Sequence, residues 1–231
     1  MRLLIKLASR SRPEQLLAVS KKYIQFARDT SNIQFVISLD TDDPTVTEEL
    51  KCLLTSIHPC IKICMGTSNS KIHAMNRDIP DPSTFDILLL ASDDMIPEVV
   101  GYDNIIREKM RKHYPDTDGV LFFNDGYQGR NVNTLSILGR KYYRRFGYIY
   151  YPGYKSFFCD NEFTKVAYKL KKQTYFATVI IRHRHPINSD AKQDSLYERN
   201  KSYFDEDMAL YNSRNKEAKN RLLPFLNTHR R

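Results

Sequence analysis

The sequence lacks cysteine pairs, long apolar runs and low-complexity segments. Its cysteines include no CxxC pair: Cys52, Cys60, Cys64 and Cys159. They do not complete a zinc site, and we expect reduced thiols in an intracellular protein. No run approaches the roughly 18 apolar residues of a membrane span, and the N-terminal segment lacks the long apolar core of a signal peptide. We therefore expect a cytoplasmic protein, in the host cytoplasm if a phage encodes it.

What is present suits a folded globular chain. The 231 residues are 41% hydrophobic and 12% aromatic, which is enough to build a full core. Glycine and proline are scattered and no linker divides the chain, so residues 1–231 are expected to form a single domain. The net charge of +9 favours a polyanionic partner such as nucleic acid, anionic lipid or a phosphorylated small molecule. A basic protein without such a partner is an equally weighted alternative.

Apolar strands alternate with helical segments in the first half of the chain. Ser11 and Glu14 have the spacing of a capping box for a first helix, and Asp43 is expected to cap a second. This alternation is typical of a parallel sheet covered by helices on both faces, so an α/β fold is predicted. The expected strands are 2–8, 33–39, 61–65 and 86–91.

The second half is predicted to be more irregular and rich in aromatic residues. A helix is expected to begin near Cys159 with Asp160 as its cap, and the C-terminal third from about residue 194 reads as helical. A short helix is expected at 140–146, and strands at 119–125, 132–139 and 174–186.

Polar residues follow three of the predicted strands. In parallel sheets ligands bind beyond the carboxyl ends of the strands, so these residues are expected to meet at one edge. Adjacent carboxylates at the end of a buried strand repel one another, and a divalent cation such as Mg²⁺ or Mn²⁺ would neutralise them. An equally weighted alternative is that Asp94 caps a helix while Asp93 is solvated. The residues are Ser9, Arg10 and Arg12, then Asp40, Asp42 and Asp43, then Ser92, Asp93 and Asp94.

Six segments, in this order along the chain, resemble the motifs of GT-A glycosyltransferases, in particular family-2-like enzymes of phage and bacterial type. The acidic segment "LLLASDDM" (88–95) is similar to the motif that holds the metal and the sugar-nucleotide diphosphate in that family, although Ser92 stands where the family has an aspartate. The other segments are "KLASRSRPEQL" (6–16), "ISLDTDD" (37–43), "SNSKIHAMNRDI" (68–79), "FCDNEF" (158–163) and "HRHP" (183–186).

The resemblance implies a GT-A-like fold with a mostly parallel central sheet and a C-terminal acceptor-side subregion. It implies a nucleotide-binding half at 1–95, an acceptor and catalytic half at 96–190, and a helical segment at 191–231. The implied activity is transfer of a sugar from a nucleotide-sugar donor, with UDP favoured, to an acceptor hydroxyl with inversion. The implied cofactor is Mn²⁺ or Mg²⁺, although the Ser92 departure leaves a metal-independent reaction open.

The resemblance also implies roles for individual residues. Asp160, or in second place Glu162, is expected to be the catalytic base, with a plain helix-start carboxylate as the alternative for each. Asp94 is expected to be the metal ligand, joined by His185 or His183, of which only one can easily point at the metal because they alternate on a strand. A lone histidine is more often structural. The donor-binding candidates are Ser9, Arg10, Arg12, Asp40, Asp43, Lys71, Asn76 and Asp93.

The acceptor and the enzyme class leave further alternatives. The stretch 140–158 contains nine aromatic and five basic residues, which suits stacking on sugars or nucleobases, or else an aromatic core under a solvated basic face. A modified DNA base and a glycan or small molecule are both credible acceptors. Asn124 and Asp125 either form an Asp-Gly turn or contact a substrate. The alternative classes are a Mg²⁺-dependent nuclease or nucleotidyltransferase, and a non-catalytic nucleic-acid-binding protein.

Overall fold

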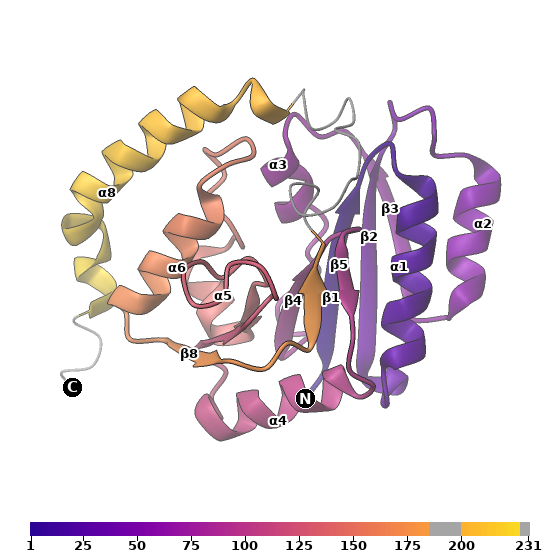
Figure 1. Ribbon diagram of the computed structural model, residues 1–231, viewed down its shortest axis with the longest axis horizontal. Helices are drawn as coiled ribbons and strands as arrows, with labels where there is room; N and C mark the ends of the chain where they lie inside the picture. The colour runs from indigo at the N-terminus through magenta and orange to yellow at the C-terminus, as the bar shows by residue number, and fades with distance from the viewer. Residues whose placement is uncertain (185–199, 227–231) are drawn as a thin grey trace.

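A computed structural model describes residues 1–184 and 200–226, with side chains for 1–184 and 200–217. Its core is a seven-stranded sheet of order β3-β2-β1-β4-β7-β6-β8 (Figure 1). The strands are β1 Leu3–Ser9, β2 Ile33–Asp40, β3 Ile61–Gly66, β4 Ile87–Ala91, β6 Val120–Phe123, β7 Ile137–Gly139 and β8 Gln173–Phe176.

The sheet is mostly parallel, which confirms the predicted fold class. Strand β1 pairs in parallel with both β2 and β4, and β2 pairs in parallel with β3. Only β7 runs against its neighbours β4 and β6, whereas β6 and β8 are again parallel. The central strands are apolar along nearly their whole length because helices bury both faces of the sheet.

Two apolar clusters lie on opposite faces of this sheet. One joins alternate residues of β1, such as Leu3 and Ile5, to α1, α2 and α4, and the other joins Leu4 to α3, α5 and α6. Helices α1 and α2 lie together on one side of the sheet, and α6 lies on the other (Figure 1). The helices are α1 Pro13–Phe26, α2 Glu48–Ile57, α3 Lys71–Asn76, α4 Tyr102–His113, α5 Arg140–Phe146, α6 Cys159–Lys169 and α8 Phe204–Leu226, with a 3-10 turn at Thr30–Asn32.

The helix caps predicted at Ser11 and Asp43 are wrong, because other residues occupy the cap positions. Helix α1 begins at Pro13 with Arg12 at the cap position and no side-chain cap bond, so no capping box forms. Helix α2 begins later than predicted and is capped by Thr47. Asp43 instead accepts hydrogen bonds from the backbone N–H groups of Ser11 (2.6 Å) and Thr45 (3.0 Å), and so ties two strand-end loops together.

The second half also departs from the sequence prediction. The strand expected over 174–186 is two strands, β8 and β9 (Ile181–His183), and β9 pairs in a separate sheet with β5 (Met95–Pro97). Within the expected strand 132–139, only Ile137–Gly139 pairs. Helix α6 is capped by Phe158 at a φ of 60°, so Asp160 lies inside its first turn instead of at the cap.

The aromatic and basic stretch 140–158 serves mainly as core and as a partner for acids. The side chains of Tyr142, Tyr150 and Tyr154 are buried. Three of the five basic residues pair with carboxylates: Arg140 with Asp86 at 3.3 Å, Lys141 with Asp116 at 2.9 Å, and Arg145 with Asp118 at 2.6 Å. The buried tyrosines and these ion pairs favour the structural interpretation of this stretch.

Helix α8 is fastened to the body by two buried acids. Arg214 in α8 forms a bidentate pair with Glu162, with both N–O distances 2.7 Å, and Tyr154 also donates to Glu162 at 2.6 Å. Asp207, fully buried, accepts hydrogen bonds from the backbone N–H groups of Lys155, Ser156 and Phe157 at 2.7–2.8 Å. No helix in the described part of the chain combines the length and the apolar character that crossing a bilayer requires.

Replacing Asp207 is expected to loosen this attachment. An Asp207→Asn amide keeps only one acceptor oxygen, so buried N–H groups in 155–157 lose partners, and the free energy of unfolding should fall by about 3 kcal/mol. Urea denaturation measures this loss. Asp205→Asn, an exposed acid on the same helix turn, is the matched control and should change stability by less than about 0.5 kcal/mol. Equal stability of the two variants would contradict the role given to Asp207.

Candidate functional site

The carboxyl ends of β1, β2 and β4 open into a cavity of about 420 Å³. Strand β1 ends at Ser9, β2 at Asp40 and β4 at Ala91, so the polar residues that follow each apolar run reach the same edge. Helices α3 and α6 and strand β9 also contribute to its wall. The predicted site residues that line it are Ser9, Arg10, Arg12, Asp40, Lys71, Asp93, Asp94, Asp160 and His183.

Asp93 is held by the residues that follow β1. The Ser9 hydroxyl donates to its carboxylate at 2.6 Å, and the Arg12 guanidinium donates at 3.1 Å. Burial raises the pKa of Asp93, and the neighbouring Asp94 carboxylate adds to that rise, while Ser9 and Arg12 oppose it. Both carboxylate oxygens of Asp93 are therefore engaged within the protein.

Asp94 lies beside His183 at the cavity wall. The carboxylate lies 3.4 Å from His183 Nε2 and accepts the hydroxyl hydrogen of Ser92. Burial alone would raise the pKa of Asp94, but His183, Ser92 and Lys71 together hold it well below its usual range. A backbone hydrogen bond from Arg184 N to Asp94 O, at 2.8 Å, fixes the two segments against each other. Asp94 is thus an ionised carboxylate at the cavity wall.

Asp125 orients the other side of the His183 ring. Its carboxylate lies 3.6 Å from His183 Nδ1 and also accepts hydrogen bonds from Thr134 (2.6 Å) and from the Tyr127 and Gln128 N–H groups. Burial lowers the pKa of His183, but Asp125 and Asp94 outweigh it and raise that pKa to about 9. Asp125 therefore both shapes the turn predicted at 124–126 and contacts a wall residue of the cavity.

The chemistry of these donors suits a hard divalent cation bound together with a diphosphate. Mg²⁺ is usually held by one or two carboxylates, with phosphate oxygens and water completing its shell. Asp94 supplies such a carboxylate, and the His183 imidazole stands beside it. No group of three or more His, Cys, Asp or Glu side chains suited to a metal occurs in the described ranges 1–184 and 200–217. A cation here would therefore depend on substrate oxygens.

Asp160 reaches the same cavity from the first turn of α6. Its Oδ1 accepts a hydrogen bond from Asn161 N at 2.9 Å, and the side chain is half-buried. Burial raises the pKa of Asp160, with the Asn161 N–H and the Lys71 charge opposing that rise. A carboxylate with a raised pKa at a cavity wall has the properties of a general base.

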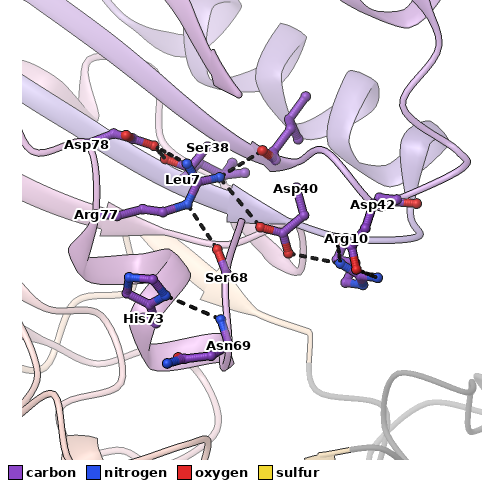
Figure 2. A network of polar contacts seen from close by, with 12 residues as sticks. Leu7, Arg10, Ser38, Asp40, Asp42, Ser68, Asn69, His73, Arg77 and Asp78 are labelled. Atoms are coloured by element: carbon purple, nitrogen blue, oxygen red, sulfur yellow. Dashed lines mark hydrogen bonds and ion pairs between the residues drawn. The ribbon is translucent and has the colours of Figure 1, made fainter. Parts of the chain in front are cut away.

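Arginines gather around the end of β2. Arg10 donates to Asp40 at 3.0 Å and makes a bidentate pair with Asp42, at 2.7 and 3.0 Å. Arg77 lies 3.5 Å from the other Asp40 oxygen. Figure 2 shows Asp40 between these two guanidinium groups. Asp40 therefore has a fixed orientation at the cavity wall.

Three predicted site residues within the described ranges do not line the cavity. Asp43 fastens loops, Glu162 pairs with Arg214, and Asn76 accepts hydrogen bonds from the Ile149 and Tyr150 N–H groups at 2.9 and 3.2 Å. Each of these three has contacts that explain it structurally, and none lines the cavity in the described part of the chain. His185 lies outside the described residues.

The sequence alone indicates no role for Lys6 or Arg77, and it is compatible with two alternatives for Asp125, a turn or a substrate contact. A lysine inside a strand whose neighbours are all apolar is the signal that Lys6 offers. Arg77 has no such signal, because its partners Leu39, Ser68 and Asp78 come together only through the fold.

Solved structures of known proteins share the fold of this chain. No protein-family model and no curated protein sequence matches the chain. Among solved structures, the mannosyltransferase PcManGT from Pyrobaculum calidifontis, in complex with GDP-Man and Mn²⁺, matches at 13% identity and a TM-score of 0.55, over 77% of this chain and 55% of that one. S. aureus TarS 1-349 in complex with UDP-GlcNAc matches at 10% identity and a TM-score of 0.62, over 85% and 60%.

A further structure, S. aureus TarS 1-349 in complex with UDP, matches at 11% identity and a TM-score of 0.59, over 93% of this chain and 71% of that one. The chain thus spans little more than half the length of the mannosyltransferase that it matches. At these identities the comparisons concern the fold alone. The chain has the mixed α/β fold, with a mostly parallel seven-stranded sheet, of these glycosyltransferase structures.

Proposed function

We propose that the chain is a glycosyltransferase that moves a sugar from a nucleotide-sugar donor, with UDP-sugar favoured, to an acceptor hydroxyl with inversion. The observation that carries this proposal is the single cavity in which Asp94, Asp160 and the arginines after β1 come together. Neighbouring folds whose structures hold GDP-Man, UDP or UDP-GlcNAc support it. The division into a nucleotide-binding half, an acceptor half and a C-terminal segment stays a prediction.

The charged residues of the cavity have places in the proposed reaction, and Asp40 would contact the ribose or the base of the donor. The acceptor oxygen attacks the anomeric carbon, its proton passes to Asp160, and the bond from that carbon to the diphosphate breaks. Lys71 supplies positive charge near the leaving diphosphate. Arg10 and Arg12 add to that charge while they also pair with Asp40, Asp42 and Asp93. Asp94 would hold Mn²⁺ or Mg²⁺, and His183 would join it as a ligand after losing its proton. The bound ion would supply further charge to the diphosphate. Ser9 and Arg12 keep Asp93 in place beside them.

The acceptor that we propose is a hydroxyl of a glycan or small molecule. The basic stretch that suggested a nucleic-acid acceptor has Arg140, Lys141 and Arg145 paired with carboxylates. The net charge of +9 is compatible with an anionic donor, so it does not require a nucleic acid.

A panel of nucleotide sugars tests the proposal without knowledge of the acceptor. The purified chain is incubated with UDP-, GDP- and dTDP-sugars, each with Mn²⁺, Mg²⁺ or EDTA, and release of the nucleoside diphosphate through slow hydrolysis is measured. We expect release from a UDP-sugar. Absence of release and of binding for every donor would refute the proposal. Nicking of DNA with Mg²⁺ alone would favour the nuclease alternative.

A further inference from the structure

Lys6 is a buried lysine in the centre of the sheet that the proposed reaction does not use. It is fully buried in β1, opposite Val36 of β2 and Leu90 of β4. A buried ammonium group carries a large desolvation cost, and an apolar side chain of similar length would give a more stable sheet. The presence of Lys6 therefore calls for a reason other than stability.

The contacts of Lys6 lead toward the cavity wall. Its Nζ donates to the Ser38 hydroxyl and lies 3.4 Å from Leu7 O. Ser38, which lines the cavity, donates in turn to Asp78 Oδ2 at 2.6 Å. Asp78 also accepts a hydrogen bond from Arg77 Nη1 at 2.8 Å. Each donor in this series of hydrogen bonds has a defined acceptor.

Arg77 connects this series of hydrogen bonds to Asp40. Its Nη2 donates to Leu39 O at 2.7 Å and lies 3.5 Å from Asp40 Oδ1, while its Nε donates to Ser68 at 2.9 Å (Figure 2). A Cβ at Gly66 would lie 2.5 Å from Arg77 Nη1, so a glycine at that position leaves room for the guanidinium. Arg77 therefore holds the carboxyl end of β2.

We propose that Lys6 is a positioning residue for the nucleoside part of the donor, acting through Ser38, Asp78 and Arg77 to fix Asp40. This inference rests on the proposed function, in which Asp40 contacts the ribose or the base. With Lys6 charged, Ser38 stays turned toward Asp78, and Arg77 remains shared between Asp78 and Asp40. Without that charge, Asp78 draws Arg77 more strongly and the hold on Asp40 weakens.

The protonation of Lys6 gives this arrangement a measurable pH dependence. Burial lowers the pKa of Lys6 to about 7, with Arg77 adding to the fall and with Asp78, Cys64 and Asp40 opposing it. The neighbour on β4, Leu90, is apolar. Lys6 is therefore charged at pH 6 and neutral at pH 8.5. Nucleoside affinity should fall as pH rises through about 7.

Lys6→Met is the test variant because it keeps the length of the side chain and removes the charge. We expect the KM for the UDP-sugar to rise about tenfold, with kcat little changed. Uridine lacks the phosphate groups that titrate near pH 6. It should bind the wild type more tightly at pH 6 than at pH 8.5 and bind Lys6→Met equally at both. NMR titration of uridine measures these affinities.

The Tm of Lys6→Met separates the two roles. Replacing a lysine that only stabilises the fold would lower the Tm, whereas replacing a positioning lysine that is costly to bury should raise it. Lys6 is charged in both the folded and the unfolded chain at pH 6, so the folded state carries the whole cost of burying it there. Lys6→Met should therefore raise the Tm more at pH 6 than at pH 9. Leu4→Met, on the same buried face of β1, is the matched control and should alter neither KM nor the pH profile.

A double-mutant cycle tests whether Lys6 acts through Ser38. If it does, Lys6→Met, Ser38→Ala and the double variant should raise KM by similar factors, because one relay is broken in each. Unchanged uridine affinity in Lys6→Met, or effects that multiply in the double variant, would overturn this inference and leave the proposed function standing. A wild type that binds no nucleotide would overturn both.

Discussion

Asp160→Asn is expected to reduce UDP-sugar hydrolysis by about 10³-fold while leaving the donor KM nearly unchanged. The side chain lines the cavity from the first turn of α6, and burial raises its pKa. An asparagine there keeps the shape and the hydrogen bond from Asn161 N but takes no proton from the acceptor. Donor binding does not use Asp160 in the proposed mechanism, so the loss should appear in kcat.

Two further measurements separate a base from a structural acid. The wild-type rate should rise with pH through the pKa of Asp160, and the variant should lack that rise. Azide needs no deprotonation before it attacks the anomeric carbon, so it should restore donor turnover in Asp160→Asn and give a glycosyl azide. Glu14→Gln changes an exposed acid in the first turn of α1 and serves as the control. Full activity of Asp160→Asn would refute the assignment.

The sequence predicts the strands near the site because the apolar runs and the polar residues that end them are adjacent in the sequence. Continuous apolar runs such as 86–91 make a strand buried on both faces, and the polar residues directly after them must lie at its carboxyl end. Hence Ser9, Asp40 and Asp94 were found by position alone, and the cavity contains all of them. Asp160 and His183 required the family resemblance, since nothing local indicates that α6 and β9 reach this edge.

What the sequence did not reveal depends on contacts between distant segments. Asp43 has the residue type of a helix cap, but the Ser11 N–H comes within 2.6 Å of it in the fold. Glu162 lies two residues from Asp160 in the same motif, and helical geometry turns it inward to Arg214. Residue types and spacings indicate the candidate site residues. Only tertiary packing distinguishes a residue that lines the cavity from one that forms an ion pair in the core.

Asp94→Asn is expected to lower turnover by about 10²–10³-fold and to abolish coupled binding of Mn²⁺ and UDP. Asp93 has both oxygens occupied by Ser9 and Arg12, whereas Asp94 faces His183 and is held in its ionised form. Asp94 is therefore the carboxylate that can meet a cation. Removing its charge should leave uridine binding unchanged, because in the proposed function the nucleoside contacts Asp40 at the end of β2.

EDTA treatment of the wild type and the Asp93→Asn variant test whether Asp94 acts through a bound cation. If Asp94 acts through a cation, EDTA-treated wild type should behave like Asp94→Asn, and electron paramagnetic resonance should show UDP-dependent Mn²⁺ binding only in the wild type. Asp93→Asn is the matched control, with the same change one residue away, and should retain Mn²⁺ binding. Wild-type turnover that is insensitive to EDTA, together with a strong Asp94→Asn defect, would assign the cationic role to His183, which stands 3.4 Å from Asp94 with its pKa raised to about 9.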